Sequence, residues 1–308
     1  MNVSVVIPTH NRRDQLKRAV RSVLAQSALP DELIIVDDGS QPAVTLNDLP
    51  DIPSRIRFVL LRNSRPLGGN AARNRGVKAA TAEWIAFLDD DDEYDDEKIE
   101  CLSKMERLSP TSVDVFFHSS IIKVNNLDIS WVSSPAYDAG KPFLNQLLVR
   151  NFVGGTSRVI IRRDVVLATG LFDESLPALQ DYEMWLRLAK EGCTFRFIND
   201  ALTVYYHDPT LSSISKSLDK YERALSKIER TYASDLRSLP FSLQRDREIR
   251  KYYVRSRKYL LGGKNVYAAR SSLSAFKLSW EVKYLLLALA SLLGCTFVYK
   301  VKSTVGNL

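Results

Sequence analysis

Cysteine is scarce in this chain of 308 residues, and Cys101, Cys193 and Cys295 lie about a hundred residues apart. None of them belongs to a CxxC pair or has a histidine cluster beside it. A disulfide framework and a cysteine-based structural zinc site are therefore excluded. This sparse use of cysteine indicates a protein of a reducing compartment.

Long apolar runs are missing as well. The N-terminal run covers only Val3–Ile7 and its basic residues follow it, the reverse of a secretory signal, so we expect the chain to stay in the cytoplasm. The last helix candidate, from Tyr284 to Tyr299, has sixteen uncharged residues. Because a bilayer span needs ~20 residues, this segment is predicted to be either a buried helix or one that lies in the membrane interface.

Two glycine-rich nucleotide motifs are absent. The turn after the first predicted strand reads PTHNRR and contains no glycine, which argues against a dinucleotide oxidoreductase. No G-x-x-x-x-G-K-[ST] sequence occurs anywhere in the chain, so a P-loop NTPase is excluded.

Charge is distributed unevenly along the chain. Residues 1–215 carry 24 Lys and Arg against 29 Asp and Glu, whereas residues 216–308 carry 19 against 7. We therefore place a boundary near Ser215 and predict a basic C-terminal region. Such a region can face nucleic acid, an anionic membrane or an acidic partner.

The first 110 residues alternate between short apolar runs and segments with helical periodicity. This βαβ pattern predicts a doubly wound, mostly parallel sheet, in which ligands bind beyond the carboxyl ends of the strands. The predicted strands are Val3–Ile7, Leu33–Val36, Ile56–Leu61 and Trp84–Leu88. Residues 1–110 are thus interpreted as a nucleotide-binding half.

Residues 111–215 continue the α/β pattern and are expected to form the other wall of a cleft. Strands are predicted at 113–124, 157–161, 195–198 and 202–206, with an amphipathic helix near 183–190. Residues 216–308 lose the strand signal and read as helices rich in Lys and Arg.

Four consecutive aspartates, Asp89 to Asp92, follow the strand Trp84–Leu88. Like charges so close together raise one another's pKa unless a cation neutralises them. Oxygen ligands without cysteine suit a hard ion, Mg²⁺ or Mn²⁺. A solvated acidic turn that caps the following helix is the alternative interpretation.

Five sequence blocks, taken in order, resemble the family-2 glycosyltransferases with a GT-A fold. They are VSVVIPTHNR, LIIVDDGS, GGNAARNRG, EWIAFLDDDD and QDYEMWLRL, and together they cover about residues 1–210. The resemblance implies a GT-A-type α/β domain that takes a nucleotide-sugar donor, most simply a UDP-sugar, followed here by the basic helical region.

The resemblance also implies roles for individual residues. FLDDDD is similar to the family's Asp-X-Asp element, with Asp89 and Asp91 as its two acids and Asp92 behind them. Asp91 and His207 would hold the Mn²⁺ or Mg²⁺. The residues that the resemblance assigns to donor binding are Pro8, Thr9, Asn11, Arg12, Asp38, Arg73, Asp89 and Asp90. Arg75 lies two positions after Arg73 on the same predicted helix and should face elsewhere.

Asp181 matches the family's catalytic base. It opens an amphipathic helix, so its carboxylate should feel the positive end of the helix dipole and stay ionised. The family usually has Glu-Asp at this point, whereas Gln180 precedes Asp181 here. Each assignment has a structural alternative: Asp38 could shape a turn, Asp181 could be an ordinary first-turn charge, and His207 could simply end a strand.

The sequence thus predicts an inverting, metal-dependent glycosyltransferase that extends a glycan or lipid-linked saccharide in surface polysaccharide synthesis. The rival is a noncatalytic nucleotide-sugar-binding or membrane adaptor with a basic tail. No nucleic-acid module is visible. The tail could dock on the inner face of the cell membrane, or it could pack on the catalytic domain or a second copy through a set of leucines: Leu285, Leu286, Leu289, Leu292 and Leu293.

Overall fold

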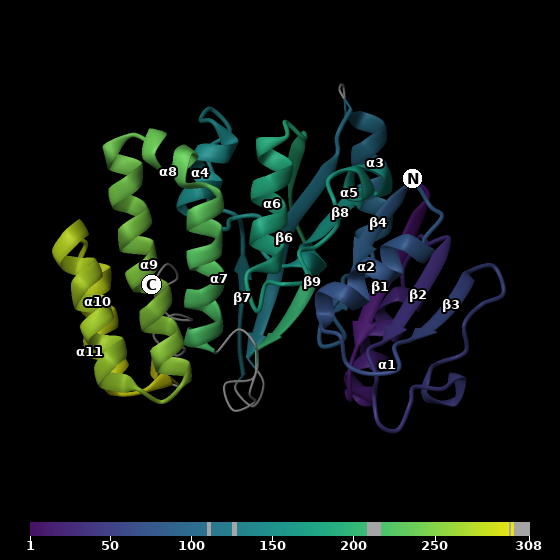
Figure 1. Cartoon of the computed structure of the whole chain (residues 1–308). Helices are drawn as coiled ribbons and strands as arrows, with labels where there is room; N and C mark the ends of the chain where they lie inside the picture. Colours follow the sequence, from purple (N-terminus) through teal and green to yellow (C-terminus); the bar gives the residue numbers. More distant parts are fainter. Residues whose placement is uncertain (110–111, 125–127, 208–216, 296, 299–308) are drawn as a thin grey trace.

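The computed structural model describes residues 1–109, 112–124, 128–207, 217–295 and 297–298. The described strands form one mixed sheet in the order β3-β2-β1-β4-β8-β6-β9-β5, with β7 added beside β6 (Figure 1). Their bounds are β1 Val3–Thr9, β2 Glu32–Asp37, β3 Arg57–Arg62, β4 Trp84–Phe87, β5 Glu93–Tyr94, β6 Val115–Val124, β7 Ile129–Ser133, β8 Val159–Arg162 and β9 Phe195–His207.

The N-terminal half has the predicted parallel arrangement. β1 pairs in parallel with both β2 and β4, and β2 pairs in parallel with β3. Every residue of β1, β2 and β4 is buried, which explains why apolar residues dominate these strands. The connecting helices are α1 Arg13–Leu24, α2 Gly69–Ala79 and α3 Lys98–Leu108.

The second half differs from the prediction in two strands, of which β7, at Ile129–Ser133, was not predicted at all. The two strands predicted at 195–198 and 202–206 are a single strand, β9, which runs parallel to β6 with register shifts near Ser119. The polar pair Asn199 and Asp200 interrupts the apolar pattern, but the strand continues through it by a β-bulge-like irregularity. The helices here are α4 Phe143–Val149, α5 Arg163–Ala168 and α6 Gln180–Lys190, together with the 3₁₀ turns Leu46–Asp48 and Thr156–Arg158.

Two apolar cores lie on opposite faces of the sheet. One contains buried side chains of α1 and α3, and the other contains buried side chains of α2, α4 and α6. Gly76 lets α2 lie close to β1, because a Cβ atom there would be 2.3 Å from Cγ1 of Val6. The second core also includes Ile228 and Tyr232, so the C-terminal region shares it.

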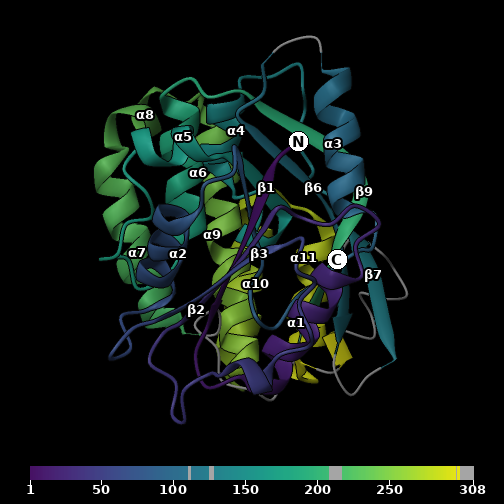
Figure 2. The same cartoon turned by 90° about the vertical axis from the view of Figure 1, so that its right-hand side faces the viewer.

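The C-terminal region is helical, as predicted. Its helices are α7 Leu218–Thr231, α8 Ala233–Ser238, α9 Phe241–Leu261, α10 Asn265–Ser279 and α11 Val282–Leu292. Figure 1 shows α9, α10 and α11 at the end of the molecule remote from β3, and in Figure 2, where the β3 side faces the viewer, they lie behind the N-terminal strands. The predicted boundary near Ser215 lies outside the described residues.

The prediction for the last helix was wrong in its extent. α11 ends at Leu292, because Gly294 adopts a φ of 97° and stops it, so no single helix runs from 284 to 299. Residues 296 and 299 lie outside the described part. The five leucines were predicted to pack on the catalytic domain or a second copy, or to lie at a membrane, and four of them are exposed: Leu286, Leu289, Leu292 and Leu293. Within the described residues, none of the helices has both the length and the apolarity needed to cross a bilayer.

Candidate active site

A pocket of about 790 Å³ opens where β1, β2 and β4 end, and it brings together most of the predicted site residues. Those that line it are Pro8, Thr9, Arg12, Asp38, Arg73, Asp89, Asp90, Asp91 and Asp181. Arg75 points away, with its guanidinium donating to the carbonyl of Arg62 and to Asn63. The sheet topology therefore gathers residues that are up to 173 positions apart in the sequence.

Two predicted residues lie outside this lining. Asn11 has a φ of 55°, and its side-chain oxygen accepts a hydrogen bond from the backbone of Gln41, so it shapes the turn after β1. His207 ends β9, where it is opposite Val124 of β6. In the described part of the chain, no three His, Cys, Asp or Glu side chains are grouped so as to hold a metal ion by themselves.

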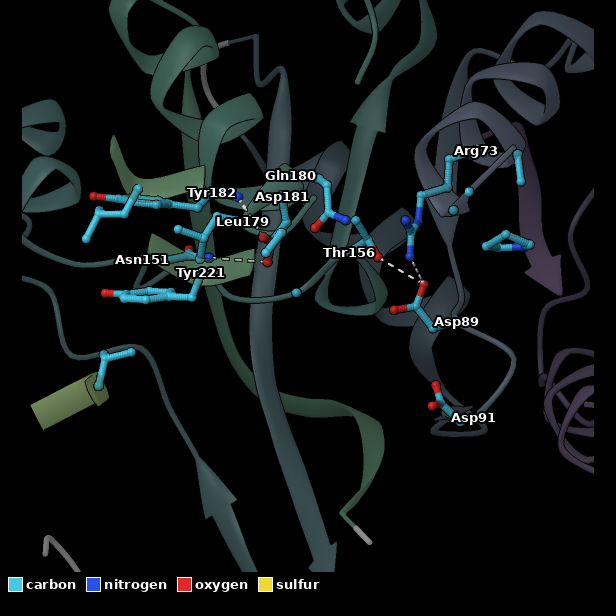
Figure 3. A pocket seen from close by; sticks show the side chains of 18 of the residues that line it. Arg73, Asp89, Asp91, Asn151, Thr156, Leu179, Gln180, Asp181, Tyr182 and Tyr221 are labelled. Atoms are coloured by element: carbon cyan, nitrogen blue, oxygen red, sulfur yellow. Dashed lines mark hydrogen bonds and ion pairs between the residues drawn. The ribbon is translucent and has the colours of Figure 1, made fainter. Parts of the chain in front are cut away.

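The acidic turn is only partly neutralised by protein cations. Arg73 pairs with Asp89, and Arg12 contacts Asp90 at 3.0 Å and Asp91 at 2.8 Å. Figure 3 shows Arg73 reaching across to Asp89, with Asp91 farther along the turn. Two guanidinium groups thus face three pocket carboxylates, and the side chain of Asp91 remains 45% exposed.

The pKa values of this turn reflect the crowding of its charges. Burial raises the pKa of Asp90 to about 6, and burial followed by the charge of Asp89 raises the pKa of Asp91. Asp92 is buried behind them, accepts a hydrogen bond of 2.6 Å from Ser157, and has a pKa raised well above its ordinary value by burial and by Asp89. The turn is therefore a site where an added cation would be favoured.

A buried lysine lies behind the turn. Nζ of Lys98 donates to the carbonyl of Ser157 at 2.7 Å and sits 3.7 Å from the ring centre of Tyr94. Burial holds the pKa of Lys98 well below its ordinary value, although the charge of Asp92 opposes that effect. The sequence offered no indication of this residue, because a lysine at the start of a helix usually faces solvent.

Asp38 organises the loop between β3 and α2. Its Oδ1 accepts hydrogen bonds from Asn63 and from the backbone of Leu67, and its Oδ2 accepts one from the backbone of Gly68. Asp38 therefore shapes this turn, which was the alternative interpretation of the residue from the sequence. One lone pair of Oδ2 is still available, since a carboxylate has about four acceptor positions.

Asp181 faces the acidic turn from the other wall of the pocket (Figure 3). Its Oδ1 accepts the backbone N–H of Tyr182 at 2.8 Å, and its Oδ2 accepts the side-chain amide of Asn151 at 3.3 Å. Leu179 precedes α6 in the left-handed conformation, with φ 58°, a strained geometry for a non-glycine residue that fixes where the helix begins.

Burial outweighs the helix dipole at Asp181. The pKa of its carboxyl is raised to about 6, mainly by burial, although the Tyr182 N–H and the charge of Arg73 favour the ionised form. The carboxylate is mostly ionised at neutral pH and can accept a proton there. A pKa near the working pH is the property expected of a general base.

The rest of the lining was not predicted from the sequence. Most of it comes from the segment after α4, from the 3₁₀ turn before β8 and from helices α6, α7 and α9. Asn151 and Thr156 contact Asp181 and Asp89 respectively. The remaining members include His10, Arg150, Tyr182, Tyr221, Arg247, Arg250, Lys251 and Lys258.

Comparison with known proteins gives consistent matches. The family model described as Glycosyl transferase family 2 matches residues 4–165. The putative teichuronic acid biosynthesis glycosyltransferase TuaG of Bacillus subtilis is 31% identical over 66% of this chain and 78% of its own length. The amylovoran biosynthesis glycosyltransferase AmsB of Erwinia amylovora is 29% identical over 67% and 70%. The crystal structure of S. aureus TarS 1-349 in complex with UDP-GlcNAc superposes with a TM-score of 0.61 at 16% identity, over 99% of this chain and 92% of that one.

Proposed function

The chain belongs to glycosyltransferase family 2, and on this premise we propose that it moves a sugar from a UDP-sugar to a glycan or lipid-linked saccharide with inversion at the anomeric carbon. The enzyme class and the GT-A fold predicted from the sequence are both confirmed, and the adaptor alternative is set aside. The names of the relatives TuaG and AmsB support a place in surface polysaccharide synthesis.

The observation that carries the proposal is the position of Asp181 across one pocket from the acidic turn. A donor whose diphosphate lies near Arg12 and Arg73 would present its sugar toward Asp181. The TarS chain, which has the same fold and was crystallised in complex with UDP-GlcNAc, supports a uridine nucleotide as donor.

The reaction proposed for this geometry is a single displacement. Asp181 accepts the proton of an acceptor hydroxyl while that oxygen bonds to the anomeric carbon, and the bond from that carbon to the diphosphate oxygen breaks with its electron pair on UDP. Among the described residues that line the pocket, the other carboxylates belong to Asp38 and the acidic turn, on the donor side. With one base and no covalent nucleophile beside it, the configuration inverts.

We also propose that Mn²⁺ or Mg²⁺ joins the donor at Asp91, with Asp89 beside it. The residues fit a hard cation, because Asp91 is half-exposed to the pocket, offers oxygen ligands only, and has a pKa raised by burial and by its neighbour Asp89. Such ions usually take one or two carboxylates and complete their shell with phosphate and water. When bound, the ion neutralises charge on the leaving diphosphate. His207 stays a predicted ligand at the end of β9.

Calorimetric titration of UDP tests donor and metal together. We expect binding with Mn²⁺ present and little binding in EDTA, because the acidic turn repels the diphosphate. Asp91→Asn should remove the metal-dependent part of the affinity, whereas Asp90→Asn should matter less, since Asp90 is buried against Thr9 and Arg12. Equal UDP affinity with Mn²⁺ and with EDTA would remove the metal from the proposal.

For the C-terminal region we propose peripheral attachment to an anionic membrane. Val282, Leu286, Leu289 and Leu293 recur at helical spacing on the exposed face of α11, and Trp280 beside them is 77% exposed. The opposite face of α11 packs on α10. Lys and Arg near an anionic surface contribute about 1 kcal/mol each, and the apolar face adds to that attraction.

Liposome flotation with anionic vesicles tests this attachment. The full-length chain should float at low salt, and a Leu286→Ser, Leu289→Ser, Leu293→Ser variant should not. Leu108→Ser, an exposed leucine on α3, serves as the control. If the triple variant floats equally well, or if the wild type forms a dimer that the triple variant lacks, the face belongs to another contact and membrane attachment is refuted.

A further inference from the structure

The wall of the pocket opposite the acidic turn is strongly basic. Helix α9 contributes most of its cations, and the segment after α4 contributes one more. The cations are Arg150, Arg247, Arg250, Lys251 and Lys258. The pocket lining is thus acidic at the end of β4 and basic on α9, and Figure 1 shows helix α6, which carries Asp181, between these elements.

Two of these cations are neutralised within the protein. Arg247 and Lys251 both contact Oε1 of Glu229 at 3.1 Å, and Lys251 also pairs with Glu248 at 2.7 Å. Arg247 also donates to the carbonyl of Leu148. These contacts hold α9 against α7 and α4. Arg247 and Lys251 thus have structural partners and need no ligand to balance them.

Arg150 and Arg250 are different. In the described part of the chain, neither guanidinium group forms an ion pair with a carboxylate. Burial lowers the pKa of Arg150, and the positive charge of Arg250 lowers it further, while Asp246 acts on it only through space. The guanidinium carbon of Arg250 lies 4.8 Å from the ring centre of Tyr253. Both guanidinium groups therefore line the same pocket, partly buried and without a carboxylate in ion-pair contact, which favours the binding of an anion there.

One of the two arginines is next in the chain to the residue that contacts the proposed base. Arg150 immediately precedes Asn151, whose amide contacts Oδ2 of Asp181 at 3.3 Å. Figure 3 shows Asn151 and the ring of Tyr221 on the same side of Asp181, away from Asp89 and Asp91. A group bound by the two arginines would thus lie on the acceptor side of the base.

We propose that Arg150 and Arg250 form an oxyanion subsite for the acceptor, and that the acceptor carries a phosphate or carboxylate group close to the hydroxyl that is glycosylated. The inference rests on the proposed function, because it assigns the opposite end of the pocket to the donor. Guanidinium groups favour such a ligand, since their fixed donors match the oxygens of phosphate and carboxylate in pairs. The subsite orients the acceptor hydroxyl toward Asp181 and selects against neutral saccharides.

The test measures anion binding with the donor end filled. Enzyme saturated with UDP and Mg²⁺ is titrated in the calorimeter with glucose 1-phosphate, with glucuronate and with glucose. We expect one or both anions to bind at least tenfold more tightly than glucose. Tighter binding of the phosphate indicates a phosphorylated acceptor, and tighter binding of glucuronate indicates a uronate-containing one.

Substitution of the two arginines tests whether the anion binds at Arg150 and Arg250. Arg150→Gln with Arg250→Gln should weaken anion binding at least tenfold while leaving UDP affinity and Tm unchanged. Arg245→Gln is the matched control, because this arginine lies on the same helix but is exposed and outside the pocket. Anion affinity that is the same in the folded double variant as in the wild type, or no preference for the anions over glucose, overturns the proposal.

Failure of this inference can be told apart from failure of the proposed function. If UDP does not bind to the wild type, the donor assignment fails, and the anion titrations without UDP still report on the two arginines. If UDP binds and the anions do not, the donor assignment stands and the acceptor subsite is refuted.

Discussion

Replacing Asp181 with asparagine gives the sharpest test of how this pocket works. The amide is nearly the same size and can still accept the Tyr182 N–H, but it cannot take a proton from the acceptor. General-base assistance is typically worth ~10²–10⁴-fold, so kcat should fall by that factor while UDP affinity is unchanged. Glu183→Gln is the control, because Glu183 lies in the same turn of α6 but pairs with Arg187 and does not line the pocket.

The pH profile supplies a second, independent measurement. With a pKa of about 6 for Asp181, the wild-type rate should be roughly tenfold lower at pH 5 than at pH 7, because only the ionised carboxylate acts as base. Asp90 also has a pKa of about 6, so the acid limb has two candidate sources. Measuring kcat at saturating donor reduces the contribution of Asp90, which lies at the donor end.

The variant Asn151→Asp distinguishes the contribution of Asp181 to the acid limb of the pH profile from that of Asp90. It preserves the oxygen that accepts the Gly154 N–H but places a negative charge about where the amide now lies, 3.3 Å from Asp181. A like charge disfavours ionisation, so the acid limb should move to higher pH by about one unit or more. An acid limb that stays in place, or near-wild-type turnover in Asp181→Asn, would refute the assignment of Asp181 as base.

The Asp181→Asn substitution should also change stability. The folded-state pKa of Asp181, about 6, lies above its ordinary value of 3.8, so the folded state favours the protonated form and loses this stabilisation as pH rises through 6. At pH 7 the free energy of unfolding of Asp181→Asn should therefore exceed that of the wild type, by an amount on the order of 1–3 kcal/mol in urea denaturation. The difference should disappear at about pH 3 and below, where the carboxyl group is neutral in both the folded and the unfolded chain.

Three further outcomes are expected. Asp38→Asn should weaken UDP binding at least tenfold in calorimetry, because the amide cannot accept all three hydrogen bonds that hold the loop from Asn63 to Gly68; unchanged affinity would contradict this. Gly76→Ala should destabilise the fold by about 1–3 kcal/mol in urea denaturation, through the 2.3 Å approach to Val6, and a neutral result would show that α2 can shift freely. Asp91→Asn should lower turnover with Mn²⁺ more than Asp90→Asn does, and the reverse order would move the proposed metal contact to Asp90.

The sequence predicted those parts of the fold that depend on the residue pattern within one short segment. Uniformly apolar runs such as Val3–Ile7 can only be strands buried on both faces, and parallel order brings their polar ends to one edge. The acidic turn and Asp38 could therefore be placed at one site from the sequence alone. Gly294 was a local signal too, and it should have ended the last predicted helix.

What the sequence could not predict depends on contacts between distant segments. The partner of Asp181 is Asn151, thirty positions away, and the raised pKa arises from burial that only the assembled pocket creates. From the sequence, the Lys and Arg residues of α9 were interpreted as facing solvent or a membrane. The periodicity of a helix does not show which of its turns lines a pocket. Arg247 and Arg250 could be separated from exposed Arg245 only in the folded chain.

The C-terminal helices are not separable from the catalytic domain, and this matters for the engineering of hybrid enzymes. They contribute Ile228 and Tyr232 to its core, and Arg247 donates to the carbonyl of Leu148. A chimera that joins residues 1–215 of this chain to the C-terminal helices of a relative would replace one wall of the pocket and the contacts through which α9 holds α4 in place. Acceptor preference cannot then be transplanted as a detachable module. A successful exchange should carry the segment around α4 together with α7 and α9, so that the arginine pair and the base keep their common support.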